Sequence, residues 1–204
     1  MSKVADDMRE SENNFRKIVW PEIKHWFGDS AELYNTENHT DSLRTEFDHV
    51  AGVDFWVVES GAGMLSIASR VQTYDKTTFT VRYSRSSGND TEYQKRMRQL
   101  QNHYELPTYT VQAYIDETLG VLRNAAACPT EQLYQYISDG EPDDDWPLIE
   151  SNESETFFPV SWGELDSEVD LLVENRWRAG LVNRPDDPTD ITEWCDDDTE
   201  AADE

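Results

Sequence analysis

Two segments, Gly52-Val-Asp-Phe-Trp-Val-Val58 and Gly63-Met-Leu-Ser-Ile-Ala-Ser-Arg-Val-Gln72, decide the fold of this chain. The first places an acid, Asp54, just before a run of β-branched and aromatic residues, which favour strands. The Gly-Ala-Gly sequence at 61–63 is typical of a tight turn between two strands. We therefore expect an antiparallel β-hairpin with strands over residues 53–58 and 64–71.

The segment before the hairpin has the spacing of an amphipathic helix over residues 11–27. Pro21 must kink or restart this helix, because proline has no N–H to donate to the carbonyl four residues back. The polar and acidic residues 29–49 predict a loop followed by a short helix. The apolar face of the predicted helix consists of Phe15, Ile18, Val19, Ile23, Trp26 and Phe27.

The segment after the hairpin completes an α/β pattern. Alternating residues predict a third strand over 77–84. Thr91 and Gln94 form a capping-box pair at the start of a helix over 91–104, and a further alternating strand follows over 108–114. The order helix, strand, strand, strand, helix, strand predicts a mixed sheet with a crossover helix.

The C-terminal third adds elements without an internal repeat. From residue 186 onward there are ten acidic residues and no Lys or Arg, which predicts a solvated, disordered tail. We expect one α/β domain over residues 1–182, with its core at about 11–137, and an acidic tail over 183–204. The added elements are predicted to be a strand or short helix over 119–127, a helix over 130–137, an acidic loop over 138–155, an edge strand over 157–162 and a last segment over 164–176.

The net charge of −26, from 43 acidic and 17 basic side chains, is the main feature of the composition. Seven Trp, nine Tyr and seven Phe provide bulky groups for a core and argue against general disorder. At molar salt, charges are screened over about 3 Å, so such a surface is tolerated. We interpret the composition as adaptation to a salt-filled cytosol, with a halophile or one of its plasmids or viruses as the source. An acidic protein that mimics DNA is the alternative interpretation.

Several other classes of protein are not indicated. Cys128 and Cys195 lie far apart, without a CxxC or His cluster, so the sequence predicts neither a disulfide framework nor a zinc site. No apolar run approaches the roughly 18 residues of a membrane span, and the N-terminus has no apolar signal-peptide core. We expect a soluble, cytoplasmic protein that does not associate with membranes. Its oligomeric state is not indicated.

Residues 70–98 form a basic island in this acidic chain, with seven Lys and Arg side chains and three acidic ones. A local excess of positive charge against an acidic background favours an anionic partner, with phosphate as the leading candidate. Four members, Arg82, Arg85, Lys95 and Arg98, are the predicted contacts to nucleic acid. In the alternative interpretation, these side chains pair with the abundant carboxylates of the protein itself.

The hairpin could present an acid, a cation and an amide at one rim. Asp54 precedes the first strand, and Arg70 and Gln72 share one face of the second strand. Hydrolysis of a phosphodiester commonly needs Mg²⁺ held by carboxylates and a positive group that stabilises developing charge. We therefore predict Asp54, Glu22 and Asp48 as metal ligands, with Glu12 as a further candidate.

Two of these acids have simpler interpretations. Glu22 follows Pro21 and would be a first-turn acid favoured by the helix dipole if the helix restarts there. Asp48 would be a turn residue before the hairpin. Both interpretations are open at the level of sequence.

The hairpin resembles the core of the PD-(D/E)XK, or restriction-endonuclease-like, nucleases. The resemblance covers about residues 11–114 and also extends to uncharacterised plasmid and viral proteins of halophiles that share an ASRVQ segment. It implies an αβββαβ core with a mixed sheet, an Asp at Asp54 and a helix-borne Glu at Glu22 or Glu12. The Glu-x-Lys of the family falls on Ala68-Ser69-Arg70, so the acid is absent and Arg replaces Lys. Arg stays charged and is a poor proton shuttle.

Two functions are therefore expected. The first is a Mg²⁺-dependent nuclease acting on DNA, with Asp54, Glu22, Arg70 and Gln72 as catalytic residues, or a degenerate derivative that binds DNA. The second is a non-enzymatic acidic protein that interacts with partners or mimics DNA. The absence of an acid at Ala68 favours a protein that does not cut, whereas the basic island favours contact with nucleic acid in either case.

Overall fold

The computed structural model describes residues 3–35, 52–59, 63–86, 88, 90–151 and 155–175, with side chains from residue 9 onward. Its largest element is a six-stranded mixed sheet in the order β1-β2-β3-β5-β6-β9. Neighbouring strands are antiparallel except β3 and β5, which are parallel. The strands are β1 (Glu32–Asn35), β2 (Phe55–Glu59), β3 (Gly63–Gln72), β5 (Tyr109–Asp116), β6 (Val121–Pro129) and β9 (Leu172–Asn175).

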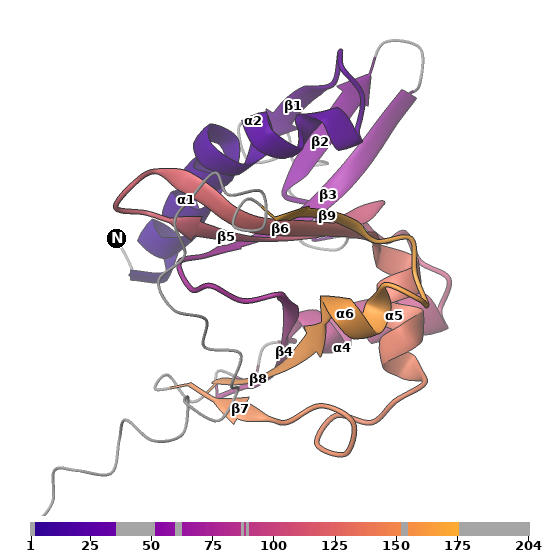
Figure 1. Ribbon diagram of the computed structural model, residues 1–204. Coiled ribbons are helices and arrows are strands. Elements are labelled where there is room, and N and C mark those ends of the chain that lie inside the picture. The colour runs from indigo at the N-terminus through magenta and orange to yellow at the C-terminus, as the bar shows by residue number, and fades with distance from the viewer. Residues whose placement is uncertain are drawn as a thin grey trace, which may run out of the picture.

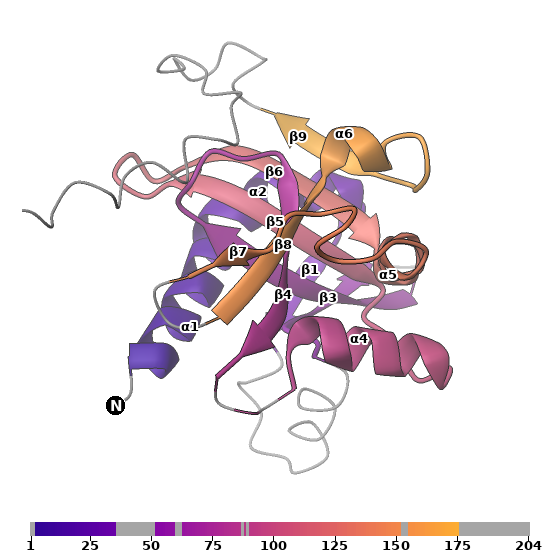
Figure 2. The same ribbon diagram turned by 90° about the horizontal axis from the view of Figure 1, so that it is seen from below.

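A second, antiparallel sheet has the order β4-β8-β7, with β4 (Thr78–Arg85), β7 (Ile149–Glu150) and β8 (Glu155–Ser161). Figure 1 shows the helical layers on the two sides of the central sheet. One side carries α1 (Lys3–Asn14) and α2 (Trp20–Ile23), and the other carries the small sheet with α4 (Glu92–Gln101), α5 (Thr130–Ser138) and α6 (Trp162–Leu165). Seen from below, β4 and β8 cross the strands of the central sheet (Figure 2).

The N-terminal helix changes its winding just before Pro21. A π-helical turn, Phe15–Val19, follows α1, and the Trp20 N–H donates to the Phe15 carbonyl five residues back. Pro21 then lies in the first turn of α2, where its missing N–H breaks no helical hydrogen bond. A 3₁₀ turn, Lys24–Trp26, ends the segment. The backbone stays helical from the π-helical turn into α2, so the predicted disturbance at Pro21 takes the form of a change in winding.

Buried apolar side chains form two clusters, one on each side of the central sheet. The first lies under the N-terminal helices and confirms their predicted apolar face. It includes Phe15, Val19, Ile23, Phe27, Phe55, Val57, Ile67, Val111, Ala113 and Ile115. The second lies between the central sheet, the small sheet, α4 and α5. It includes Phe79, Val81, Tyr114, Leu133, Ile137, Phe158, Val160 and Trp162.

Several local predictions are confirmed. The hairpin pairs β2 with β3 from Phe55↔Ile67 to Glu59↔Gly63. Thr91 caps α4 in a complete capping box with Gln94. The strand predicted over 108–114 is β5, the helix predicted over 130–137 is α5, and the ambiguous segment 119–127 is the strand β6.

Three predictions about the sheets are corrected. The third strand predicted over 77–84 is a strand, β4, but it pairs with β8 in the small sheet because β5 occupies the free edge of β3. The third antiparallel strand of the central sheet is instead β1, which lies in the region predicted as loop and helix and is too short for a clear alternation. The predicted edge strand over 157–162 is β8, which lies between β4 and β7.

The predicted last segment over 164–176 contains the end of α6 and the strand β9. The predicted tail over 183–204 lies outside the described residues, as does Asp48. No helix in the described part of the chain is both long and apolar enough to span a membrane.

Candidate functional site

Asp54 lies just before β2 and supports the neighbouring strand. Its N–H donates to the Ile67 carbonyl at 2.9 Å. Its Oδ2 atom accepts hydrogen bonds from the Ser69 N–H at 2.6 Å and from the Ser69 hydroxyl at 3.2 Å. Because the ladder between β2 and β3 ends at Phe55↔Ile67, the Asp54 carboxylate provides Ser69 with an acceptor beyond the end of that ladder.

Arg70 is directed to the small sheet. Its Nη1 donates to the Thr80 carbonyl at 3.1 Å, and its Cζ lies 4.9 Å from the centre of the Phe157 ring. The Arg82 Cζ lies 5.4 Å from the centre of the same ring. One aromatic ring therefore contacts two guanidinium groups.

Burial lowers the pKa of the Arg70 guanidinium. The carboxylate of Glu92 acts in the opposite direction, whereas the like charge of Arg82 lowers the pKa further. A half-buried cation with a second cation as its neighbour favours a nearby anion.

The structure thus brings Asp54 and Arg70 to different partners. Ser69 and Arg70 are consecutive on β3, so their side chains project to opposite faces of the sheet. The Asp54 carboxylate lies against Ser69, whereas the Arg70 guanidinium lies against Thr80 and Phe157.

Gln72, one of the predicted catalytic residues, belongs to a polar network between the two sheets. Its Oε1 atom accepts from the Gln112 side-chain amide at 3.0 Å and from the Thr80 hydroxyl at 3.3 Å. The Gln112 Oε1 atom accepts from the Thr80 N–H at 3.4 Å. Gln72 also lines a cavity of about 320 Å³ beside α1, together with Asn14 and Tyr74.

The remaining predicted acids lie on the N-terminal helices. Glu22 is half-buried in the first turn of α2, as the helix-restart interpretation expects, and Glu12 is half-buried in α1. Among the described residues, no three His, Cys, Asp or Glu side chains are grouped so that they could hold a metal ion. The Mg²⁺ that the resemblance implies does not fit the described residues, since Ala68 has no carboxylate and Asp54 Oδ2 already accepts two hydrogen bonds.

Several members of the basic island have partners within the fold. The Arg82 Nε lies 3.0 Å from Glu155 Oε2, and the Arg98 Nη1 donates to Asp90 Oδ2 at 2.7 Å. The hydrogen bond from Arg98 lowers the pKa of Asp90. These contacts agree with the interpretation in which the arginines pair with the carboxylates of the protein.

Arg96 is a buried member of the island whose role the sequence does not reveal. Its Nη1 donates to Gln99 Oε1 at 3.0 Å, and its Nη2 donates to the Gly52 carbonyl at 2.8 Å. Gly52 has φ +57, and a Cβ there would lie 2.8 Å from Arg96 Nη2. A positive φ strains most residues with a side chain, so glycine suits this position, and Arg96 and Gly52 together fix the entry to the hairpin.

Two other residues of the basic island, Arg85 and Lys95, differ from Arg82, Arg96 and Arg98 in their contacts. The buried Nε of Arg85 has no hydrogen-bond partner within the described residues, and Lys95 is half-buried on α4.

Phe157 and Glu155 are site residues that the sequence interpretation missed. Both lie on β8, far along the chain from the basic island, and contact it only because β8 pairs with β4. The alternation within residues 157–162 indicated a strand but gave no information about its partner.

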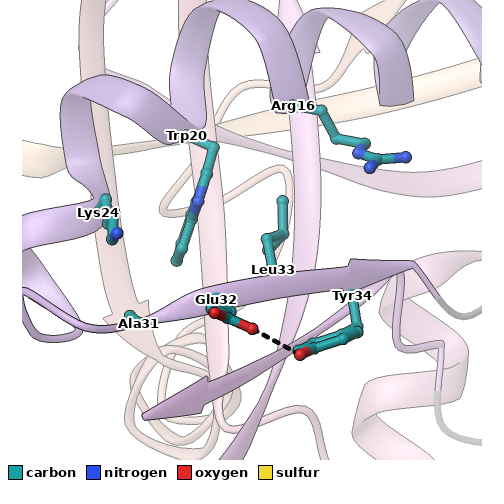
Figure 3. A pocket seen from close by; sticks show the side chains of 7 residues that line it. All are labelled: Arg16, Trp20, Lys24, Ala31, Glu32, Leu33 and Tyr34. Atoms are coloured by element: carbon teal, nitrogen blue, oxygen red, sulfur yellow. Dashed lines mark hydrogen bonds between the residues drawn. The ribbon is translucent and has the colours of Figure 1, made fainter.

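A second hollow lies at the opposite edge of the molecule, between the N-terminal helices and β1. Its volume is about 410 Å³. Figure 3 shows Arg16, Trp20 and Lys24 on the helical wall above β1, with Glu32 and Tyr34 beside each other on the strand. The Tyr34 hydroxyl donates to Glu32 Oε2 at 2.6 Å, and this hydrogen bond raises the pKa of Tyr34.

Comparisons with known protein families, with curated proteins and with solved structures find no match to this chain.

Proposed function

We propose that this protein is a degenerate, non-cleaving relative of the PD-(D/E)XK nucleases that binds DNA. The connectivity of the central sheet supports this relationship. After the β2–β3 hairpin, the chain passes through β4 and α4 and returns as β5, parallel to β3, while α1 and α2 cover the opposite face. This is the order of strand, helix and strand along the chain that the resemblance implies after the hairpin, although β4 joins the small sheet and not the central one.

The surroundings of the hairpin support a protein that does not cut. The family's acid is replaced by Ala68, and the carboxylate of Asp54 accepts hydrogen bonds from Ser69. Arg70, at the position of the family's Lys, stays protonated and packs on Phe157. These residues stabilise the hairpin and the inter-sheet layer without activating a water molecule.

The contact of Arg70 and Arg82 with one Phe157 ring is the observation that carries the proposal of DNA binding. All three side chains are half-buried, so each retains some exposure to solvent. Guanidinium groups bind phosphate, and an exposed aromatic ring can stack on a base. Arg85 on the same strand and Lys95 on α4 supply further positive charge around this aromatic centre.

The test measures DNA cleavage and DNA binding with the same full chain in KCl from 0.2 to 2 M. With Mg²⁺ or Mn²⁺ present, we expect no cleavage of double- or single-stranded DNA. Phe157→Leu, which keeps apolar volume but removes the aromatic face, should weaken binding of single-stranded DNA by about fivefold or more, because stacking on a base contributes roughly 1–3 kcal/mol. Arg82→Gln should weaken binding of duplex DNA. It should also make the slope of log binding constant against log KCl concentration shallower, by about 0.9 for each phosphate that the variant no longer neutralises.

Two matched variants sharpen this test. Glu155→Gln removes the acid beside Arg82 and should strengthen binding, which is the opposite effect of Arg82→Gln. Arg123→Gln removes the same charge at a distant ion pair with Asp116 and should leave binding unchanged. Metal-dependent cleavage that Asp54→Asn abolishes would show that the protein is an active nuclease, and binding insensitive to both Phe157→Leu and Arg82→Gln would exclude this surface.

A second candidate function is that of an acidic protein that occupies the DNA-binding surface of a partner. The net charge of −26 and the internal pairing of Arg82 and Arg98 favour it. In that case the chain should fail to bind DNA at every salt concentration in the same assay.

A further inference from the structure

The outer edge of β1 is a candidate site for an added strand. Within the described residues β1 pairs with β2 alone and lies at the end of the central sheet. An extended segment can bind to the edge strand of a sheet by continuing the sheet.

The groove beside this edge has a cationic wall. Arg16 is exposed and Lys24 is half-buried, and both face the hollow of about 410 Å³ between the helices and β1 (Figure 3). The chain has only 17 basic side chains against 43 acidic ones, so two cations along one open groove are a selective feature. Glu32 also lines the groove, but its carboxylate accepts a hydrogen bond from the Tyr34 hydroxyl, and the two cations still outnumber this one acid. The lining therefore suits an extended segment that carries carboxylates.

We propose that the groove along β1 is the docking site of the chain's own acidic segment, residues 186–204. This segment carries ten acidic residues and no Lys or Arg, together with Ile191 and Trp194, which can supply apolar contact beside the carboxylates. Its carboxylates would pair with Arg16 and Lys24, and its backbone would pair with the outer edge of β1.

The position of β9 makes this docking reachable. The last described strand ends at Asn175, and the carboxylate of Glu174 within it lies 4.0 Å from His25 Nε2. His25 follows Lys24 in the 3₁₀ turn, so the chain leaves β9 beside the helical segment that forms the wall of the groove. The ten residues 176–185 can span up to about 33 Å when extended, which exceeds the roughly 24 Å covered by five strand spacings across the sheet.

The test uses a nitroxide label on Cys195, inside the proposed docking segment. The other cysteine, Cys128, is fully buried in the core, and burial raises the pKa of its thiol to about 12, so labelling should be selective. We expect the label to broaden the amide NMR signals of Leu33, Tyr34 and Lys24 in the full chain. The broadening should be stronger in 0.2 M KCl than in 2 M KCl, because salt screens the ion pairs.

Charge reversal provides the decisive comparison. Arg16→Glu combined with Lys24→Glu should abolish the broadening along β1, whereas Lys17→Glu combined with Lys95→Glu, two reversals outside the groove, should preserve it. The amide spectrum of each variant reports at the same time whether the fold is intact, and Arg16→Gln with Lys24→Gln serves if the reversals unfold the protein.

Three results would overturn the proposal. The first is unbroadened signals along β1 in the unsubstituted chain, and the second is broadening that the groove variants leave unchanged. The third is broadening that appears only between molecules, in a mixture of isotope-labelled and spin-labelled chains, which would assign the segment to a second copy. None of these results depends on DNA binding, so they are independent of the proposed function.

Discussion

The two faces of the central sheet are equally buried but differ in chemistry, as consecutive residues of β5 illustrate. Val111, Ala113 and Ile115 face the N-terminal helices in an apolar cluster. On the same strand, Gln112 faces the small sheet, where it donates to Gln72 and accepts from the Thr80 N–H. The helix-side face needs only apolar groups of suitable volume, whereas the opposite face combines an apolar cluster with polar groups that need specific donors and acceptors.

Because of this difference, the positions of the helices on one face and of β4 on the other are determined by different interactions. On the helix side, apolar residues at helical spacing meet apolar residues at strand spacing, and many arrangements of similar volume bury them well. On the other side, a misplaced strand would leave buried amide and hydroxyl groups without partners, at a cost of about 1–3 kcal/mol each. The polar layer should therefore fix the position of β4 on β3 and β5.

The largest expected effect lies on the apolar face. Phe55 is fully buried and its ring stacks on Phe15, with 4.7 Å between the ring centres. Phe55→Ala should lower the free energy of unfolding by about 3–5 kcal/mol, because it removes this stacking and leaves a cavity. Denaturant unfolding at constant KCl concentration measures the decrease. A decrease below about 1 kcal/mol would mean that the helices do not form a close-packed layer on the sheet.

A smaller decrease is expected on the polar face, from a substitution that keeps the volume. Gln112→Leu leaves the Thr80 N–H without its acceptor and removes one of the two donors to Gln72 Oε1, so it should lower the free energy of unfolding by about 1–3 kcal/mol. Ile67→Leu, a comparable exchange on the apolar face, should cost less than about 1.5 kcal/mol. If both variants lower the free energy of unfolding by the same small amount in this assay, the polar groups on one face do not require specific partners more than the apolar face does.

Thr91 caps α4 and links this helix to β4 on the side of the central sheet that carries the small sheet. The Thr91 hydroxyl accepts from the Gln94 N–H at 3.3 Å and donates to the Tyr83 carbonyl of β4 at 3.1 Å. Thr91→Ala should lower the free energy of unfolding by about 1 kcal/mol, whereas Thr91→Ser keeps the oxygen and should be much less destabilised. If both variants are destabilised equally, the missing methyl group and not the hydrogen bonds accounts for the effect.

Local patterns predict much of the apolar side. The disturbance of the helix near Pro21, the hairpin and the capping box all depend on residues within a few positions of one another, and the structure contains all three. β1 could not be predicted, because its four residues are too few for a clear alternation. The small sheet was missed for another reason, since β4 and β8 pair across about 70 intervening residues and nothing in either strand identifies the other.

The same limit applies to the candidate site. Sequence spacing correctly places Asp54 beside the start of the hairpin, but its partner is a backbone N–H, which every residue except proline provides. Arg70 was identified from a resemblance that ends at about residue 114. Phe157 lies beyond that point, so the contact between Arg70 and the Phe157 ring could not be predicted from the resemblance.

The smallest effect is expected at an ion pair away from both faces, where β5 turns into β6. The Arg123 Nη2 donates to Asp116 Oδ2 at 2.7 Å, and this hydrogen bond is the main reason why the pKa of Asp116 lies below its usual value of 3.8. A carboxyl whose pKa is lower in the folded state stabilises the fold above the unfolded pKa. That contribution disappears as the pH falls from about 3.8 through the folded value.

Arg123→Gln should therefore make the free energy of unfolding fall less steeply with decreasing pH below about 4, relative to the unsubstituted chain. Lys17→Gln removes the same charge from an exposed position outside the groove and should leave this part of the pH dependence nearly parallel to that of the unsubstituted chain. The difference between the two variants should shrink in molar KCl, since screening weakens partly exposed ion pairs. Identical profiles for both variants at low salt would mean that the ion pair at the β5–β6 turn contributes no pH-dependent stability, leaving the two buried faces to account for the stability of the sheet.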